Sequence, residues 1–285
     1  MYNCSGDLQP LVSIIVRTCN RPNVLRQAIE SIQKQTYPNV EVVVVEDGAN
    51  ESENMLLEEY GNLHIKYFNM KNKVGRSKTG NFALAHATGK YFNFLDDDDV
   101  LYPEHIEKLV RILEGSSSRA AYSIAEESQI IVKSTEPYVV REKRRLVRYA
   151  QPFNRTLLYH SNYIPIQSIL FRRELYEHLG GFDEELEVLE DWDLWVRYST
   201  MTDFIYVDKV TSLYHVPFVR KNKWKRNIRL HSTQEVIQQK FDGYNLQMNV
   251  GQIHRDMDYV VKKYKTGKCK RYMRLIIDFL MYGER

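Results

Sequence analysis

The segment Tyr91-Phe-Asn-Phe-Leu-Asp-Asp-Asp-Asp99 joins a short apolar run directly to four carboxylates. A run that mixes aromatic and aliphatic side chains is typical of a buried strand, and in open α/β sheets ligands bind where such strands leave the sheet. Four adjacent carboxylates repel one another, and a divalent cation such as Mn²⁺ or Mg²⁺ would relieve that repulsion. The alternative is a solvated acidic turn that caps a helix beginning near Pro103. Because the acids follow a buried strand, the sequence favours a metal site.

Apolar runs and helical patterns alternate on both sides of this segment. A strand over 11–16 precedes a helix that begins at Pro22, and the unbroken apolar run 41–45 predicts a strand buried on both faces. Further strands are expected over 64–68, 120–124, 166–171, 204–207 and 210–214, and further helices over 51–60, 77–87, 103–113, 173–179 and 191–198. Residues 136–162 are mixed and basic, and we expect loops or a flexible lid there. The alternation predicts an α/β fold with a mostly parallel central sheet flanked by helices.

Length and composition are those of a globular protein. The 285 residues can bury a full core and are enough for one large α/β domain with an appendage. No apolar signal segment opens the chain and no apolar stretch approaches about 18 residues, so we expect neither export nor a membrane-spanning helix. The three cysteines, Cys4, Cys19 and Cys269, are too scattered for a disulfide framework or a zinc site, which favours a cytoplasmic location.

The net charge of +3 conceals two parts of opposite sign. Residues 1–216 hold 24 Lys and Arg against 31 Asp and Glu, a net charge of −7. Residues 217–285 hold 16 against 6, a net charge of +10. So sharp a change predicts a boundary near residue 217, between a main domain (1–216) and a basic helical extension (217–285).

Three polar loops are expected to meet the four aspartates at one edge of the sheet. They span 17–21 after the first strand, 46–50 after the second, and 72–78 before the helix that leads to the acids. Their candidate donor-binding side chains are Thr18, Asn20, Asp47, Arg76 and Lys78. Polar groups and a carboxylate can bind a base and ribose, and cations at a helix N-terminus can hold a diphosphate. Each loop alone is ordinary turn chemistry, but their convergence favours a nucleotide site.

Seven motifs follow one another between residues 10 and 197. They are Pro10-Leu-Val-Ser-Ile-Ile-Val-Arg-Thr-Cys-Asn-Arg-Pro22, Ala28-Ile-Glu-Ser-Ile-Gln-Lys-Gln-Thr36, Val45-Glu-Asp-Gly48, Gly89-Lys-Tyr-Phe-Asn-Phe-Leu-Asp-Asp-Asp-Asp99, Phe171-Arg-Arg-Glu-Leu175, Gly180-Gly-Phe-Asp183 and Glu190-Asp-Trp-Asp-Leu-Trp-Val-Arg197. This ordered set resembles family 2 glycosyltransferases with the A-type glycosyltransferase fold. The resemblance covers residues 10–216 and implies transfer of a sugar from a nucleotide sugar to an acceptor hydroxyl, with inversion at the anomeric carbon.

The resemblance implies a role for each matching residue. Implied at the donor are Thr18, Asp47 at the base, and Asp99 near the donor sugar. Implied at Mn²⁺ or Mg²⁺ are Asp96 and Asp98, with Asp98 favoured as the direct ligand, and Asp96 and Asp97 are also candidates for donor binding. Implied at the reacting centre are Asp191 as the catalytic base and Glu190 beside the acceptor. His215 is a further candidate for the metal or the diphosphate, although a lone histidine is more often structural. UDP is the default nucleotide, because the family often uses it.

Two positions depart from the family pattern. Many members have an aromatic residue where Cys19 stands, so base stacking from that loop is in doubt. Many also have an arginine directly before the asparagine that matches Asn81, but Gly80 occupies that place. Arg76 or Lys78 is the expected source of the missing cation.

The chemistry also follows from the residues themselves. Breaking the anomeric C–O bond leaves negative charge on the diphosphate, which a cation held by Asp96 and Asp98 would stabilise. The attacking hydroxyl must lose a proton, and Asp191 is a plausible acceptor. The alternative for Glu190 and Asp191 is the acidic first turn of an amphipathic helix. That alternative does not explain why the acids follow a Gly-Gly-Phe-Asp turn, so we favour catalysis.

The basic extension suggests a partner. Lys and Arg clusters are attracted to anionic membrane surfaces, and a short helix over 271–282 would place apolar side chains in the interface. A glycan or lipid-linked acceptor at the inner membrane face fits that arrangement. A solvated helical face packed on a protein partner is an alternative, and nucleic acid is the less favoured one. Absence of binding to anionic vesicles would count against the membrane.

Two other functions remain as alternatives. A nucleotide-sugar-binding module that has lost catalysis would account for Cys19 and Gly80, but not for an intact Asp191. A sugar-phosphate nucleotidyltransferase shares a similar sheet but needs a Gly-rich loop after the first strand, and residues 17–22 contain no glycine. Hydrolysis of a nucleotide sugar in the presence of Mn²⁺ would separate an enzyme from a binding module.

Overall fold

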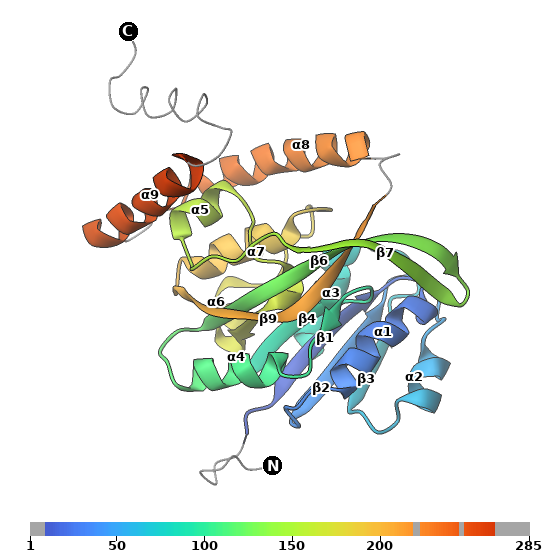
Figure 1. Ribbon diagram of the computed structural model, residues 1–285. Helices are drawn as coiled ribbons and strands as arrows, with labels where there is room; N and C mark the ends of the chain where they lie inside the picture. Colours follow the sequence, from blue (N-terminus) through green and yellow to red (C-terminus); the bar gives the residue numbers. More distant parts are fainter. Residues whose placement is uncertain (1–8, 219–222, 245–247, 266–285) are drawn as a thin grey trace.

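One sheet organises the molecule. The computed structural model describes residues 9–218, 223–244 and 248–265. Within them the strand order is β3-β2-β1-β4-β8-β6-β9-β5, and β7 pairs with β6 (Figure 1). The strands are β1 Val12–Thr18, β2 Val40–Glu46, β3 Ile65–Asn69, β4 Tyr91–Asp96, β5 Val100–Leu101, β6 Ala120–Thr135, β7 Tyr138–Val147, β8 Ile169–Arg172 and β9 Phe204–Pro217. Strands β3, β2, β1 and β4 are parallel neighbours, which confirms the predicted α/β architecture.

Helices cover both faces of the sheet (Figure 1). They are α1 Pro22–Gln33, α2 Glu53–Glu59, α3 Arg76–His86, α4 His105–Glu114, α5 Arg155–His160, α6 Arg173–Leu179, α7 Glu190–Ser199, α8 Lys223–Phe241 and α9 Val250–Lys265, with a 3-10 turn at Ile166–Ser168. The predicted start of α1 at Pro22 is confirmed; a proline there loses no intrahelical hydrogen bond. Helix α1 buries one apolar face, which includes Leu25 and Ile29, against the sheet.

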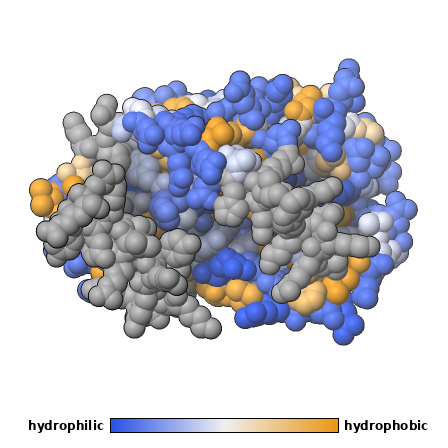
Figure 2. All heavy atoms as spheres, turned by 90° about the horizontal axis from the view of Figure 1, so that it is seen from above, coloured by the Kyte–Doolittle hydropathy of each residue, from blue (hydrophilic) through white to orange (hydrophobic). Residues whose placement is uncertain are grey.

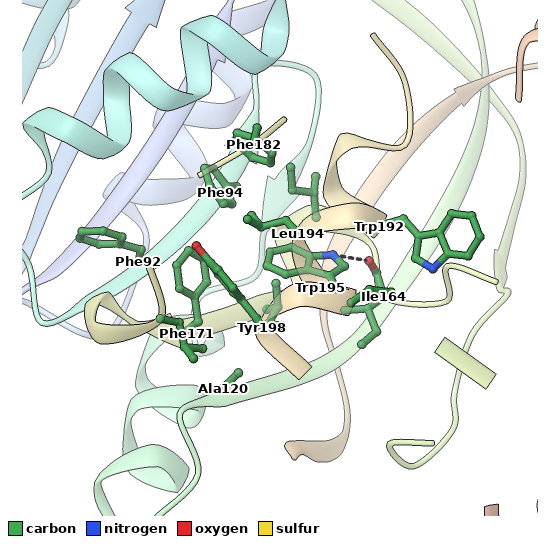
Figure 3. Packing of buried hydrophobic residues seen from close by; sticks show 14 of the residues in the cluster. Phe92, Phe94, Ala120, Ile164, Phe171, Phe182, Trp192, Leu194, Trp195 and Tyr198 are labelled. Atoms are coloured by element: carbon green, nitrogen blue, oxygen red, sulfur yellow. Dashed lines mark hydrogen bonds between the residues drawn. The ribbon is translucent and has the colours of Figure 1, made fainter. Parts of the chain in front are cut away.

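The larger hydrophobic core fixes α7, the helix that carries the candidate base. Aromatic rings of β4 and β8 meet those of α7: Phe171 lies 5.9 Å from Trp195 and 5.2 Å from Tyr198, centroid to centroid (Figure 3). The buried Trp195 Nε1 donates to the carbonyl oxygen of Ile164 at 3.2 Å, so its polar atom is also satisfied (Figure 3). A helix held by such large buried rings gives its N-terminal residues a fixed position.

The structure corrects two expectations about secondary structure. Residues 136–162, expected as loops or a flexible lid, contain strand β7 and helix α5. The side chains of β7 are mostly exposed on both faces, so the strand lacks the apolar alternation that signals one. The strands expected over 204–207 and 210–214 are one strand, β9, which pairs with β6 on both sides of two register shifts.

The helices of the basic extension pack on the main domain. Ile237 and Phe241 of α8 belong to the larger core, and the Asp256 carboxylate of α9 accepts from the backbone N–H of Thr156 at 3.2 Å. The boundary near residue 217 stays a prediction from charge. The helix expected over 271–282 lies outside the described residues. No helix within the described ranges is long and apolar enough to cross a membrane. The face that α8 crosses is mostly hydrophilic where it is coloured (Figure 2).

Candidate active site

The ends of three strands bring the predicted loops together. In the sheet register Arg17 lies opposite Asp96, and Thr18 lies opposite Glu46. The Asp47 carboxylate, just beyond β2, accepts from the backbone N–H of Val74 at 2.6 Å and of Gly75 at 3.0 Å. The loops 17–21, 46–50 and 72–78 therefore meet at one edge of the sheet, as predicted from the strand order.

Asn20 closes the contact between the first two loops. Its side-chain oxygen accepts from the backbone N–H of Ala49 at 2.9 Å. Gly48 has φ +140°, and a Cβ there would lie 2.4 Å from that same oxygen. Any larger residue at position 48 would therefore displace Asn20, so Asn20 and Asp47 hold the loops in place as well as lining the candidate donor site.

Two arginines, Arg17 and Arg21, form ion pairs with three of the four aspartates. Asp96 accepts from Arg17 Nε at 2.9 Å and Nη2 at 2.7 Å. Asp97 accepts from Thr18 Oγ1 at 2.7 Å and is ion-paired with Arg21. Asp98 lies 3.7 Å from Arg21, and Asp99 accepts from the backbone N–H of His215 at 3.2 Å.

Two cations do not balance four buried acids. Burial raises the pKa of Asp97 to about 7, and the charge of Asp98 adds to that rise. Burial, with the charge of Asp96, also raises the pKa of Asp98. Only Asp96 has a lowered pKa, because Arg17 and Arg76 outweigh the effect of its burial. In the absence of a further cation the protonated form of these acids is therefore favoured, and a bound cation would take the place of those protons.

Arg17 is a functional candidate that the sequence did not reveal. Its Nη1 donates to Glu190 Oε1 at 3.1 Å while Nε and Nη2 hold Asp96, and its side chain is only 6% exposed. The missing arginine at Gly80 has a steric reason: a Cβ there would lie 2.6 Å from the Phe182 ring and 3.5 Å from Arg17 Cδ. Arg17 and Phe182 fill that space, so Arg17 supplies the buried cation. The presence of Gly80 in the sequence signals that the arginine is missing there, but it does not show which other residue supplies a positive charge.

Arg76 and Lys78 occupy outer positions. Arg76 begins α3, is largely exposed, and lies 3.7 Å from Glu190. Lys78, two residues further along α3, is also exposed, and its side chain makes no ion pair with the described residues. Arg76 and Lys78 are the side chains expected to replace the arginine that is missing at position 80. Arg76 lies 3.7 Å from Glu190, whereas Arg17 lies 3.1 Å from it.

Glu190 and Asp191 begin α7 after a strained residue. Leu189 has φ 61° and ψ 20°, a left-handed conformation that is costly for a branched side chain. The Asp191 carboxylate, which is partly exposed, accepts from Asn162 Nδ2 at 2.9 Å and from the backbone N–H of Trp192 at 2.8 Å. Desolvation, followed by the charge of Glu190, raises the pKa of Asp191 to about 7. A carboxylate with that pKa can both exist ionised and take up a proton near neutral pH.

The acid cluster has donors that suit Mn²⁺ or Mg²⁺. Among the described residues no three His, Cys, Asp or Glu side chains form a ready cage. These ions, however, complete their shells with water and phosphate, and the carboxylates of Asp96 and Asp98 supply hard oxygen ligands. His215 Nδ1 contacts the backbone carbonyl oxygen of Asp98. Because a carbonyl only accepts, Nδ1 carries the proton in this contact, and Nε2 is the nitrogen with a lone pair that a metal could use.

Comparison with known proteins identifies the family. The family model described as glycosyl transferase family 2 matches residues 13–180. An uncharacterized glycosyltransferase of Rickettsia typhi is 32% identical over 199 residues, 70% of this chain and 61% of the relative. The uncharacterized glycosyltransferase YwdF of Bacillus subtilis is 31% identical over 186 residues, 65% of this chain and 67% of the relative. The chain belongs to glycosyl transferase family 2, which confirms the resemblance drawn from its motifs.

Solved structures confirm the A-type glycosyltransferase fold. The S. aureus TarS 1-349 complex with UDP-GlcNAc has a TM-score of 0.61 and 17% identity, over 96% of this chain and 76% of that one. The mannosyltransferase PcManGT from Pyrobaculum calidifontis, in complex with GDP-Man and Mn²⁺, has a TM-score of 0.59 and 17% identity, over 97% and 82%. The sequence match to the Rickettsia typhi glycosyltransferase spans 61% of the length of that relative.

Proposed function

We propose that this chain transfers a sugar from a nucleotide-diphosphate sugar to an acceptor hydroxyl, with inversion at the anomeric carbon. One observation carries the proposal: Arg17 bonds a candidate metal ligand, Asp96, and also Glu190, the neighbour of the candidate base. Donor activation and proton removal are thereby linked through one side chain. We place a UDP- or GDP-linked donor at the site, with UDP as the default, since structural relatives bind UDP-GlcNAc and GDP-Man.

Asp191 is the proposed base. Asn162 and the N–H of Trp192 orient its carboxylate, and its partial exposure leaves it open to a hydroxyl. The acceptor oxygen bonds to the anomeric carbon while the C–O bond to the diphosphate breaks. The proton passes to Asp191, and the electron pair of the broken bond stays with the diphosphate. One displacement of this kind inverts the carbon.

The charges around the diphosphate come from several elements. Asp96, Asp98 and His215 would hold Mn²⁺ or Mg²⁺, which would stabilise the departing diphosphate as a Lewis acid. The exposed guanidinium of Arg76 lies at the N-terminus of α3, whose dipole also favours phosphate oxygens. Arg17 adds a buried positive charge behind Asp96.

The first experiment measures donor hydrolysis. Wild-type protein is expected to release UDP from UDP-GlcNAc, or GDP from GDP-Man, with Mn²⁺ and not with EDTA. Asp98→Asn is expected to lower that rate on the order of 100-fold or more, because it removes a ligand to a charge worth several kcal/mol in the transition state.

Asp208→Asn is the matched control, since Asp208 is exposed on β9 and hydrogen-bonds only Tyr206 among the described side chains. This control should turn over like the wild type. An equal rate in EDTA would refute the metal site. A wild-type protein that binds nucleotide sugars without turnover would support the alternative, a catalytically inactive nucleotide-sugar-binding module.

An aromatic hollow supports a glycan acceptor. It has a volume of about 370 Å³ and is lined by Tyr159, His160, Gln238, Asp242 and Tyr244, among others. Its wall residue Phe241 packs edge-to-face on Trp192, which follows the base, with centroids 5.6 Å apart. Ring faces beside amide and carboxylate groups suit a sugar ring. We therefore place a glycan or lipid-linked acceptor there, in cell-surface polysaccharide or glycolipid synthesis, with the basic extension facing an anionic membrane surface.

Removing one ring tests the acceptor hollow. Tyr244→Ala is expected to raise the KM for glycoside acceptors severalfold while donor hydrolysis in their absence stays unchanged, because none of the aspartates 96–99 is among the residues that line the hollow. Tyr206→Ala, at a tyrosine of β9 outside the hollow, serves as the control. Steady-state kinetics with a panel of methyl glycosides gives both numbers. An unchanged acceptor KM would remove the hollow from the proposal.

A further inference from the structure

Strand β7 spans the candidate site from the metal side to the base side. At its start, Tyr138 lies within electrostatic range of Asp98 and Arg21. Just past its end, Tyr149 lies within electrostatic range of Asp191. The ribbon of β6 and β7 and the segment that follows it therefore lie near both halves of the candidate site.

The sheet register explains how the ribbon reaches the aspartates. Strand β6 pairs with β9 as far as Ile130, and in that ladder Ser128 lies opposite His215, which contacts Asp98. Beyond Ile130, β7 is the only partner of β6 among the strands that the structure describes. Two register shifts, at Gln129/Ile130 and at Val132/Ser134, interrupt this ribbon. Such irregularities bend a two-stranded ribbon and increase its twist. In Figure 1 the ribbon arches toward the end of α1 that follows Arg21.

Tyr138 faces inward at the tip of this ribbon. It is partly buried, whereas Pro137 before it and Val139 after it are exposed. Burial raises the pKa of Tyr138, the Asp98 carboxylate raises it further, and the Arg21 guanidinium lowers it. The phenol ring thus lies on the same side of the ribbon as the acids and the first polar loop.

We propose that Tyr138 contacts the nucleoside diphosphate part of the donor and closes the site from above. This inference rests on the proposed function. The first loop carries Cys19 at its tip and therefore offers no ring for a base or ribose. Tyr138 offers a ring from the opposite side, together with a hydroxyl that can donate to a phosphate oxygen. The ribbon then acts as the roof of the donor site, with Tyr138 as a donor-binding residue.

The test uses UDP and GDP as probes on the full chain with Mn²⁺, by isothermal titration calorimetry. Tyr138→Ala is expected to weaken binding about tenfold, the effect of losing one ring–base contact. Tyr138→Phe separates the ring from the hydroxyl: binding equal to wild type assigns the contact to the ring, and a loss equal to that of Tyr138→Ala assigns it to the hydroxyl. Val139→Ala is the matched control, because it alters the exposed side of the same ribbon and should bind like the wild type.

Melting temperatures close to wild type for all three variants would exclude a folding defect. Equal binding by wild type and Tyr138→Ala would overturn this inference and leave the proposed function standing. Equal losses in Tyr138→Ala and Val139→Ala would also overturn it, since the ribbon and not the ring would then matter. A wild-type protein that binds neither UDP nor GDP and hydrolyses no nucleotide sugar would overturn the proposed function itself.

Discussion

Asp191→Asn is expected to lose transfer activity by on the order of 1,000-fold while it still binds the nucleotide donor. General-base catalysis contributes about 10²–10⁴-fold, and an amide cannot take the proton of the acceptor hydroxyl. The variant should fold, because the asparagine Oδ1 can still accept from the N–H of Trp192, and Asn162 can turn its own side-chain oxygen toward the new amide. Steady-state transfer assays and donor titrations measure the two effects separately.

The pH dependence gives the same assignment a second readout. Because the pKa of Asp191 is raised from 3.8 to about 7, kcat/KM of the wild type should rise with pH through about 7 and then level off. Between those two values the folded state holds a proton that the unfolded state has released, so this group contributes less stability as pH rises through about 7. Asp191→Asn should therefore melt at a higher temperature than wild type at pH 8.

Asp208→Asn, again at an exposed site, should change neither the transfer rate nor its pH profile. Retained turnover in Asp191→Asn would refute the base assignment. A wild-type rate that is flat between pH 5 and pH 8 would show that a different group takes the proton.

Arg17→Met is expected to combine a large loss of stability with a large loss of activity. The side chain of Arg17 is 6% exposed and neutralises both Asp96 and Glu190. Removing one partner from a buried ion pair costs about 3–5 kcal/mol, because the remaining charges stay desolvated. Arg17→Lys keeps the charge but not the fork that holds two acids at once, so it should restore only part of the loss.

A double-mutant cycle separates the pair from general damage. Glu190→Gln in the Arg17→Met background removes one of the two acids that Arg17 had paired, so it should recover part of the lost free energy of unfolding. Arg26→Met is the matched control: Arg26 pairs with Glu59 at the surface, where such pairs contribute less than about 1 kcal/mol. Urea unfolding measures all four free energies. Strictly additive effects of Arg17→Met and Glu190→Gln would contradict the proposed link.

The sequence predicted the parallel half of the fold because its strands are apolar on both faces and its helices carry a single apolar stripe. The sequence did not predict strand β7, because both faces of this strand are largely exposed to water. Such a strand does not need the alternation of apolar and polar residues by which strands are recognised. The sequence predicted two strands in place of β9 because Asp208 and Lys209 interrupt its apolar pattern. In the structure the pairing with β6 skips these two residues and resumes at Val210.

The candidate site was predictable where it follows from strand order. Parallel strands end at one edge, so the convergence of Thr18, Asp47 and Asp96 could be expected before any coordinates. The role of Arg17 could not, because it depends on distances among residues 17, 96 and 190, which are far apart in the chain. The space that Phe182 takes beside Gly80 is likewise a fact of three-dimensional packing.

The anchoring of α5 by the last described helix has a mechanical consequence. Asp256 accepts from the N–H and hydroxyl of Thr156, and its own carbonyl oxygen accepts from Asn154. Helix α5 leads directly to Asn162, which orients Asp191. A chain shortened at the charge boundary would therefore lose the hydrogen bonds that hold α5 and, through Asn162, the proposed base Asp191. The acidic and basic parts of the chain thus depend on each other mechanically, although their net charges are opposite.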